Sequence, residues 1–167
     1  MVEHRVGWLN PLFEGLSWIG TQGLVWLVIA LALAVARRRP LLLARVVLAD
    51  GCAQLLAYAI KQASGRARPS TIYEHPKPLV CAPHDGSLPS GHAASSFACA
   101  TVLAFAIPRY AWAFYLLAAA IAWSRVYVGV HYPLDVLGGA ALGVVVATAL
   151  RMLEAALRRS RRGPRAG

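Results

Sequence analysis

Three short groups of polar residues carry side chains that could do chemistry in a chain that is otherwise strongly apolar. They are KQASGRARP (61–69), PSGH (89–92) and SRVYVGVHYPLD (124–135). Lysine, arginine, histidine and aspartate are side chains that bind anions, transfer protons or attack as nucleophiles. Because only 14% of the residues are charged, their concentration in these groups indicates a functional site.

The third group places a histidine and a carboxylate around the start of a helix. Pro133 suits a first helical turn, so His131 precedes this helix and Asp135 lies in its first turn. A carboxylate there can accept a hydrogen bond from one imidazole nitrogen, which fixes the tautomer and leaves the other nitrogen free as a nucleophile. Taken alone, the pair also fits a structural contact or half of a metal site.

The second group has the features of an anion site at a helix start. Ser90 is a good N-cap, Gly91 lets backbone N–H groups approach a ligand, and a helix N-terminus carries partial positive charge. His92 would then lie beside a bound phosphate. An ordinary serine cap with an incidental histidine is the plain alternative.

Lys61, Arg68 and Arg125 supply fixed positive charge near these groups. Such cations can stabilise the negative charge of a phosphoryl group without a metal. Arginine binds two oxygens at once, and lysine acts as a point charge. The alternative is that all three residues are interfacial anchors whose charged ends reach water.

Five apolar runs must position these groups. With 58% hydrophobic residues and a mean hydropathy of +0.54, the chain is too apolar for an ordinary soluble domain. The runs have the length of membrane-spanning helices, and they cover residues 16–36, 41–60, 91–107, 110–127 and 134–153. We therefore predict a single domain, 1–167, that forms an all-α integral membrane bundle.

The remaining segments are assigned by composition. Residues 1–15 combine aromatic and polar side chains, which is typical of a short interfacial helix. Residues 62–90 hold five of the ten prolines and predict a long loop, and residues 156–167 predict a flexible basic tail. The loop histidines His75 and His84 lack a ligand cluster at fixed spacing, so we expect solvated side chains and no metal site.

The distribution of cations predicts an orientation in the plasma membrane. If the five spans alternate, 11 of the 17 Lys and Arg residues fall on the side of the C-terminus, which the positive-inside rule assigns to the cytoplasm. The three polar groups then meet on the extracytoplasmic side. The basic tail would lie near anionic lipid and not bind nucleic acid, because it has no interleaved aromatic residues.

Two further patterns predict helix packing. One helical face of the second span is polar and should point into the bundle; it consists of Asp50, Gln54, Tyr58 and Lys61. Asp50 could tune the site, but a structural hydrogen bond to a neighbouring helix is favoured. Gly139 and Gly143 permit close backbone approach, either within the chain or in a homodimer.

In their order along the chain, K-x6-R-P, P-S-G-H and S-R-x5-H-x3-D resemble the signature of the type 2 phosphatidic acid phosphatase (PAP2) family. The resemblance implies a PAP2-like bundle that hydrolyses lipid phosphates without a metal or other cofactor. It implies that His131 attacks phosphorus to form a phosphohistidine, that Asp135 orients His131, and that His92 protonates the leaving oxygen and later activates water. The residues it implies for phosphate binding are Lys61, Arg68, Ser90, Gly91 and Arg125.

The same resemblance suggests undecaprenyl diphosphate, phosphatidylglycerol phosphate or phosphatidic acid as the substrate. An outward-facing site favours the polyprenyl diphosphate, because a carrier lipid released on that side has to be recycled. A non-catalytic lipid-binding membrane protein is the alternative of another class. A vanadium haloperoxidase is a further enzymatic alternative, against which the five apolar runs argue.

Overall fold

The computed structural model describes residues 5–161, which fold as helices with no strand among them. The α-helices are α1 (Asn10–Ile19), α2 (Leu24–Ala36), α3 (Leu41–Ser64), α4 (Pro69–Ile72), α5 (Gly91–Ala106), α6 (Ala111–Tyr127) and α7 (Pro133–Arg161). Short 3-10 helices are η1 (Gly7–Leu9), η2 (Thr21–Gly23) and η3 (Pro108–Tyr110). The prediction of an all-α fold is confirmed for the described residues.

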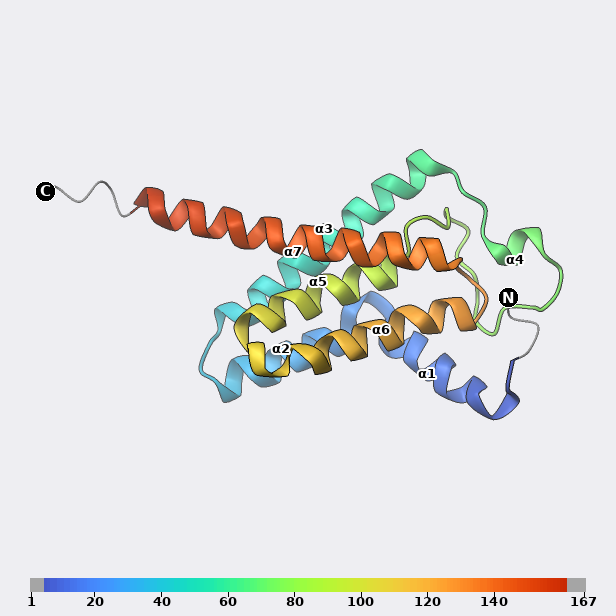
Figure 1. Ribbon diagram of the computed structural model, residues 1–167, viewed down its shortest axis with the longest axis horizontal. Coiled ribbons are helices and arrows are strands. Elements are labelled where there is room, and N and C mark those ends of the chain that lie inside the picture. The colour runs from blue at the N-terminus through green and yellow to red at the C-terminus, as the bar shows by residue number, and fades with distance from the viewer. Residues whose placement is uncertain (1–4, 162–167) are drawn as a thin grey trace, which may run out of the picture.

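The long helices run along the long axis of the molecule, so their ends gather at two opposite ends (Figure 1). One end holds the connection from α3 to α5, which includes α4, and the loop between α6 and α7. The other end holds the α2–α3 and α5–α6 connections. This alternation brings the three polar groups of the sequence to one end.

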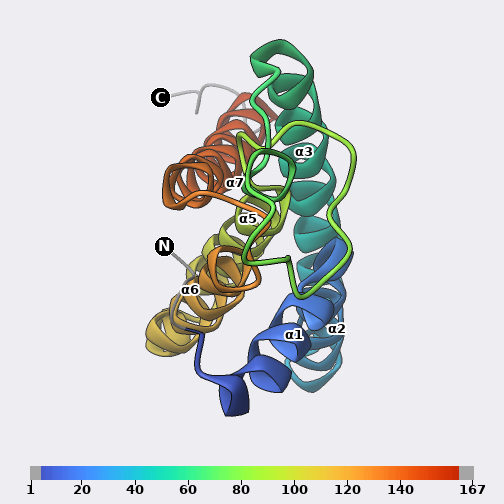
Figure 2. The same cartoon turned by 90° about the vertical axis from the view of Figure 1, so that its right-hand side faces the viewer.

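α5 is the central helix and packs against α3, α6 and α7 (Figure 2). Its sequence, GHAASSFACATVLAFA, is rich in small residues, and Ala94, Ser96 and Ala98 are completely buried. Small side chains allow neighbouring helix backbones to come close. The start of α5, which carries PSGH, is therefore held on three sides.

Gly139 and Gly143 of α7 face the backbone of α5. A Cβ atom at Gly139 would contact the carbonyl oxygen of Ser90, and a Cβ atom at Gly143 would contact that of Ala94 and lie 2.7 Å from the backbone nitrogen of Ala98. The glycine pair thus serves packing within the chain. It gives no support to the predicted homodimer.

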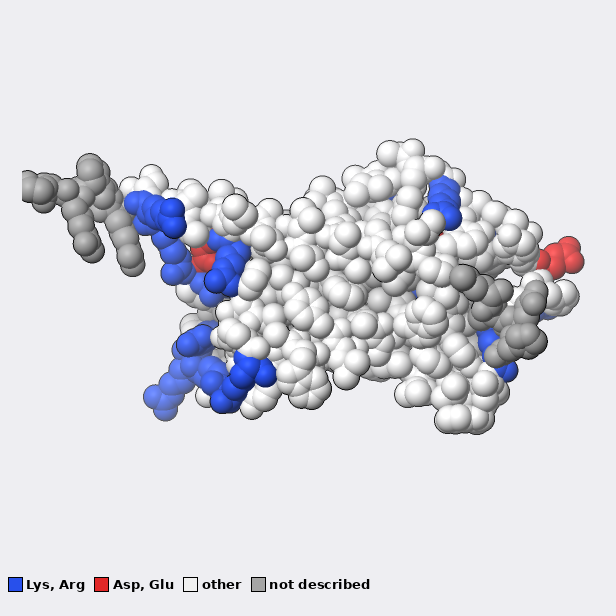
Figure 3. Space-filling model, in the orientation of Figure 1, with Lys and Arg blue, Asp and Glu red and all other residues white. Residues whose placement is uncertain are grey.

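The outer surface is apolar in its middle and charged at its ends. Large hydrophobic side chains are exposed on several helices, among them Val28, Leu55, Trp112, Leu116 and Val145. On the face shown in Figure 3, lysine and arginine lie towards the two ends of the molecule and the middle carries no charged side chain. Such a belt suits lipid and not water. The chain is therefore a membrane protein.

Helix length alone supports fewer spans than the sequence predicts. The stretches Leu41–Ile72 and Pro133–Arg161 are long and apolar enough to cross a membrane, and the bent pair Gly7–Ile19 and Leu24–Ala36 adds a third if it counts as one span. α5 is apolar but has 16 residues, a length of about 24 Å against a hydrocarbon thickness of about 30 Å. The five-span count stays a prediction.

The first predicted span, 16–36, is not a straight helix. α1 extends to Ile19, and the axis bends by 64° before α2. Gly23 lies in the bend with φ +71°, a conformation that glycine adopts without strain. Of the predicted interfacial segment 1–15, η1 and the first part of α1 are helical, and residues 1–4 lie outside the described residues.

The prediction of a flexible tail is wrong for residues 156–161, because α7 continues to Arg161. Glu154 accepts a hydrogen bond from Arg158, one turn later, and another from Arg45 of α3, each 2.6 Å long. An i,i+4 pair of this kind favours helix. Residues 162–167 of the predicted tail lie outside the described residues.

Asp50 has the structural role that the sequence favoured. Its carboxylate is buried and accepts hydrogen bonds from Ser95 Oγ of α5 at 2.5 Å and from Gln54 Nε2 at 2.9 Å. The predicted inward face is wrong for Tyr58, which is 56% exposed. Eight residues after Asp50, Tyr58 is rotated by about 80° from it around the helix.

Candidate active site

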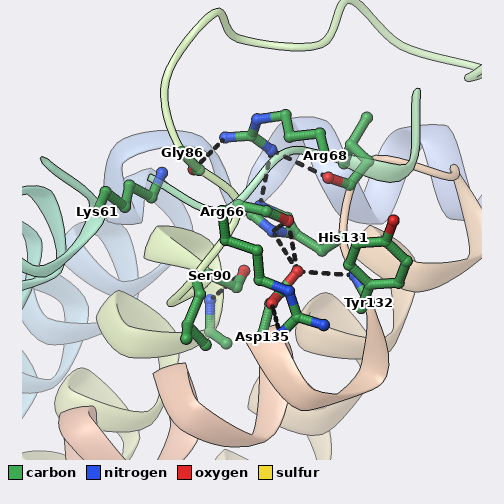
Figure 4. Close-up of polar contacts among 12 residues, drawn as sticks. Lys61, Arg66, Arg68, Gly86, Ser90, His131, Tyr132 and Asp135 are labelled. Atoms are coloured by element: carbon green, nitrogen blue, oxygen red, sulfur yellow. Dashed lines mark hydrogen bonds and ion pairs between the residues drawn. The ribbon is translucent and has the colours of Figure 1, made fainter. Parts of the chain in front are cut away.

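The end of α3 and the loop after it deliver the cations of the first polar group. Lys61 lies in the last turn of α3, which ends at Ser64 and is capped by Gly65 with φ +55°. A residue with positive φ at this position reverses the chain direction after a helix. In Figure 4 the Arg68 side chain lies above His131, and the Arg66 side chain extends past Ser90 to Asp135.

His131 lies in the loop between α6 and α7, and 2% of its side chain is exposed. Nη1 of Arg68 lies 3.1 Å from Nε2 of His131. Arginine can only donate hydrogen bonds, so Nε2 accepts and has no proton in the neutral ring. The ring proton is then on Nδ1, and Nε2 keeps the lone pair that a nucleophile needs.

Burial is the main reason that the pKa of His131 is lowered to about 4. The contact with the Asp135 carboxylate acts in the opposite direction and raises this pKa. The positive charges of Arg68, Arg125 and Lys61 lower it further. The imidazole is therefore neutral at pH 7, as nucleophilic attack requires.

Asp135 is completely buried, and its Oδ2 lies 3.6 Å from Nδ1 of His131. This distance is too long for the direct hydrogen bond that the sequence predicts. The carboxylate is bonded to three other groups: Oδ2 accepts from the Ser87 hydroxyl and from the Tyr132 N–H at 2.9 Å, and Oδ1 accepts from Arg66 Nη1 at 3.0 Å.

The structure adds three residues that the sequence analysis did not assign to the site. Ser87 is completely buried; its Oγ lies 3.5 Å from Nδ1 of His131 and donates a hydrogen bond to the Asp135 carboxylate. Arg66 pairs with Asp135 and lies over the ring of Tyr132 at 4.8 Å. Asp85 pairs with Lys61 and Arg68. These residues come from the predicted polar groups or from the loop between them, but their pairing depends on the folded loop.

Ser90 confirms the predicted helix cap. α5 begins at Gly91, and the Ser90 Oγ accepts a hydrogen bond from the Ala93 N–H at 3.5 Å. The Ser90 N–H donates to the carbonyl oxygen of Asp135 at 2.8 Å, which ties the start of α5 to the first turn of α7.

His92 and Arg125 lie beside Ser90 and His131, although one nitrogen of the Arg125 guanidinium is bonded to α1. The ring of His92 is within electrostatic range of Lys61, Arg125 and His131. Arg125 of α6 is 4% exposed, and its Nη1 donates to the Ser17 hydroxyl of α1. The predicted role of Arg125 in phosphate binding thus involves a guanidinium that is also anchored to α1.

Within residues 5–161, Nε2 of His92 and Nε of Arg125 are buried polar atoms without a hydrogen-bond partner. Buried groups of this kind are rare in native proteins, because each loses its bond to water. A ligand with oxygen atoms can supply the partners. The two atoms belong to residues that the sequence assigns to the leaving group and to the phosphate.

A cavity of about 320 Å³ opens beside His131 and is lined by Tyr73, His75 and Tyr132 among others. A larger cavity of about 540 Å³ lies between α3, α5 and α7 and includes Arg45 and Glu154. Its lining contains none of the predicted site residues. Of the predicted site residues, His131 alone lines the smaller cavity.

His75 and His84 are exposed loop residues, as the sequence predicts. In the described part of the chain, no group of three or more histidine, cysteine, aspartate or glutamate side chains is arranged to hold a metal ion.

Comparison with protein families identifies the family of the chain. The model of the PAP2 superfamily matches residues 23–159, a range that contains all the predicted site residues. The chain therefore belongs to the PAP2 superfamily.

Individual relatives narrow the class to enzymes that act on lipid phosphates. The chain is 32% identical over 141 residues to an undecaprenyl-diphosphatase of Sulfolobus acidocaldarius, covering 84% of this chain and 68% of the relative. It is 35% identical over 159 residues to the decaprenylphosphoryl-5-phosphoribose phosphatase of Mycobacterium tuberculosis, covering 89% and 82%. The crystal structure of LpxE from Aquifex aeolicus superposes with a TM-score of 0.77 at 28% identity, covering 89% and 88%. The chain is a lipid phosphatase of this superfamily.

Proposed function

We propose that the chain hydrolyses a lipid diphosphate or phosphomonoester through a phosphohistidine formed on His131. The observation that carries this proposal is the buried imidazole of His131, whose Nε2 lies 3.1 Å from the Arg68 guanidinium. A phosphate that binds Arg68 and draws it away from this contact would lie against the lone pair of Nε2. Lys61, Ser90, the Gly91 N–H and Arg125 would hold the remaining phosphate oxygens.

The reaction then takes two steps. In the first, Nε2 of His131 forms a bond to phosphorus, the bond from phosphorus to the leaving oxygen breaks, and His92 donates a proton to that oxygen. In the second, the neutral His92 takes a proton from water, the water oxygen attacks phosphorus, and the bond to Nε2 breaks to release phosphate. Asp135 stabilises the positive charge that develops on the His131 ring.

Polyprenyl diphosphate is the proposed physiological substrate. One relative with high coverage is named as an undecaprenyl-diphosphatase, which agrees with the preference stated from the sequence. A second is named for a decaprenylphosphoryl sugar phosphate. Phosphatidylglycerol phosphate and phosphatidic acid are the alternative substrates, since the catalytic residues recognise phosphate alone. The alternative of another class is a lipid-binding protein without catalysis.

The proposed membrane arrangement has five spans, with the active site on the extracytoplasmic side and the C-terminus in the cytoplasm. The cations at the far end of the molecule support it through the positive-inside rule. A homodimer stays a prediction without further support.

Phosphate release by the purified protein tests the proposal. The assay uses undecaprenyl diphosphate, phosphatidylglycerol phosphate and phosphatidic acid in the presence of EDTA. We expect release to be fastest from the polyprenyl substrate, to persist in EDTA and to stop with vanadate. Folded protein that releases no phosphate from any of these lipids would support the non-catalytic alternative.

A further inference from the structure

The Asp85 carboxylate is hydrogen-bonded to the two cations, Lys61 and Arg68, that the proposed function assigns to phosphate binding. Its Oδ2 accepts a hydrogen bond from Nζ of Lys61 at 2.7 Å, and its Oδ1 accepts one from Nη2 of Arg68 at 2.6 Å. These are charge-assisted bonds of the kind that the same cations make to phosphate oxygens. Asp85 thus presents its own negative charge where a phosphate has to bind.

Burial of the three side chains is unequal. Lys61 and Arg68 are 10% and 2% exposed, whereas Asp85 is 29% exposed. A buried cation without a partner is strongly unfavourable, so Lys61 and Arg68 need an anion whether or not substrate is present. Asp85 comes from the loop and can turn towards water when another anion takes its place.

Asp85 is charged under ordinary conditions. Burial alone would raise the pKa of its carboxyl group, but the hydrogen bonds from Lys61 and Arg68 outweigh this effect and hold the pKa below its ordinary value. At neutral pH, a phosphate therefore meets a full negative charge that is already bound to both cations.

The loop around Asp85 also directs Arg68 towards the nucleophile. Nε of Arg68 donates to the Asp85 carbonyl oxygen at 3.0 Å, and Nη2 also donates to the carbonyl oxygen of Gly86 at 3.3 Å (Figure 4). The remaining nitrogen, Nη1, lies against Nε2 of His131. A phosphate can reach Nε2 only if Arg68 shifts, and Arg68 is held in place by Asp85.

We propose that Asp85 is an internal anion that competes with substrate and product phosphate for Lys61 and Arg68, and thereby sets how tightly the site holds phosphate. This inference rests on the proposed phosphate-binding role of the two cations. It assigns Asp85 to the release of product, because Asp85 takes back the cations as inorganic phosphate departs. The opposite role is a carboxylate that arranges Lys61 and Arg68 for phosphate, and the two roles predict opposite effects of its removal.

Binding of inorganic phosphate, measured by calorimetry on the detergent-solubilised protein, distinguishes the two roles. We expect Asp85→Asn to bind phosphate about tenfold more tightly than the original chain, since it removes one charged competitor. Glu74→Gln is the matched control, because Glu74 is an exposed carboxylate of the same loop with no ion pair to any residue in 5–161. Unchanged or weaker phosphate binding by folded Asp85→Asn would overturn the inference.

A second measurement needs no change at Asp85. Cys81 is exposed and lies four residues before it, so a fluorophore attached to Cys81 in a Cys52→Ala background reports on this part of the loop. Phosphate should change the fluorescence with a midpoint equal to its dissociation constant. A signal that stays constant while phosphate binds would contradict displacement of Asp85.

These experiments separate the inference from the proposed function. Both experiments measure phosphate binding and not turnover, so an inactive protein can still bind phosphate more tightly after Asp85→Asn. Conversely, a fully active enzyme whose Asp85→Asn variant binds phosphate less tightly would refute the inference alone.

Discussion

At the scale of single residues, the site controls which nitrogen of His131 can react. The Arg68 guanidinium faces Nε2, while Ser87 and Asp135 face Nδ1. A donor on one side and acceptors on the other select one tautomer. In the proposed mechanism, the imidazole is therefore ready to attack through Nε2 before a substrate arrives.

The decrease in activity at acid pH tests the protonation state of the His131 ring. Only the neutral ring can attack, and its pKa is lowered to about 4, so activity should fall only as the pH decreases towards that value. We expect half-maximal kcat/KM well below pH 6, after correction for ionisation of the substrate, because kcat/KM reports the free enzyme. A decrease centred near pH 6.5, the ordinary pKa of histidine, would show that the ring is not shielded from water.

Ser87→Ala tests whether Asp135 acts on His131 through the Ser87 hydroxyl. Without this bridge the ring loses its orientation, and we expect kcat to fall about tenfold or more with little change in KM. Ser64→Ala is the control, because the Ser64 hydroxyl bonds the carbonyl oxygen of Leu88 at the same end but does not contact Asp135. Equal losses in both variants, or a change confined to KM, would contradict the role.

The residue types of the site could be predicted from the sequence, but the pairing could not. His131, Asp135 and Ser90 are recognisable because they flank predicted helix starts. Ser87 and Asp85 lie in a loop without periodicity, where no sequence pattern determines which side chains face each other. The predicted direct bond from Asp135 to His131 failed for the same reason, since it took no account of the Ser87 hydroxyl that bonds to the same carboxylate oxygen.

At the scale of elements, the contact between α5 and α7 holds the two halves of the site together. α5 carries Ser90 and His92, and α7 carries Asp135. The helices approach closely because Gly139 and Gly143 have no side chain where the α5 backbone passes. A change in this contact should therefore disturb stability and catalysis together.

Gly143→Ala tests that coupling. The added Cβ meets the carbonyl oxygen of Ala94 and the backbone nitrogen of Ala98, so we expect a loss of about 1–3 kcal/mol in stability. Thermal unfolding in detergent and phosphate release should both be reduced. Gly51→Ala is the control, because a Cβ there has no neighbour within 4 Å; a similar effect of both variants would argue against the close contact.

Helix boundaries followed from the sequence wherever a cap or a proline marks them, as at Ser90 and Pro133. The bend between α1 and α2 and the extension of α7 to Arg161 could not be predicted from the sequence. A hydropathy run shows that a segment is apolar but not whether it is straight. Ion pairs between helices, such as Arg45 with Glu154, depend on the folded arrangement.

At the scale of the whole molecule, charge and apolar surface divide the protein into two ends and a belt (Figure 3). The end with the site holds buried cations paired with carboxylates, and the other end holds exposed arginines of the α2–α3 connection and of α7. This asymmetry is what the positive-inside rule needs to orient a bundle.

Labelling of cysteines in intact cells tests the proposed orientation, and α5 is the critical helix because it is short for a span. A membrane-impermeant maleimide should label Cys81 from outside in a Cys52→Ala background. A cysteine introduced by Arg109→Cys, at the other end of α5, should react only after permeabilisation. Labelling of both positions from the same side would show that α5 does not cross the membrane.

Detection of the phosphorylated residue tests the central claim most directly. The protein is mixed with labelled polyprenyl diphosphate, quenched in alkali and analysed by mass spectrometry. We predict phosphate on His131 and none in His131→Ala, whose turnover should fall at least about 10³-fold. Folded His131→Ala that still releases phosphate, or a label on another residue, would contradict the account.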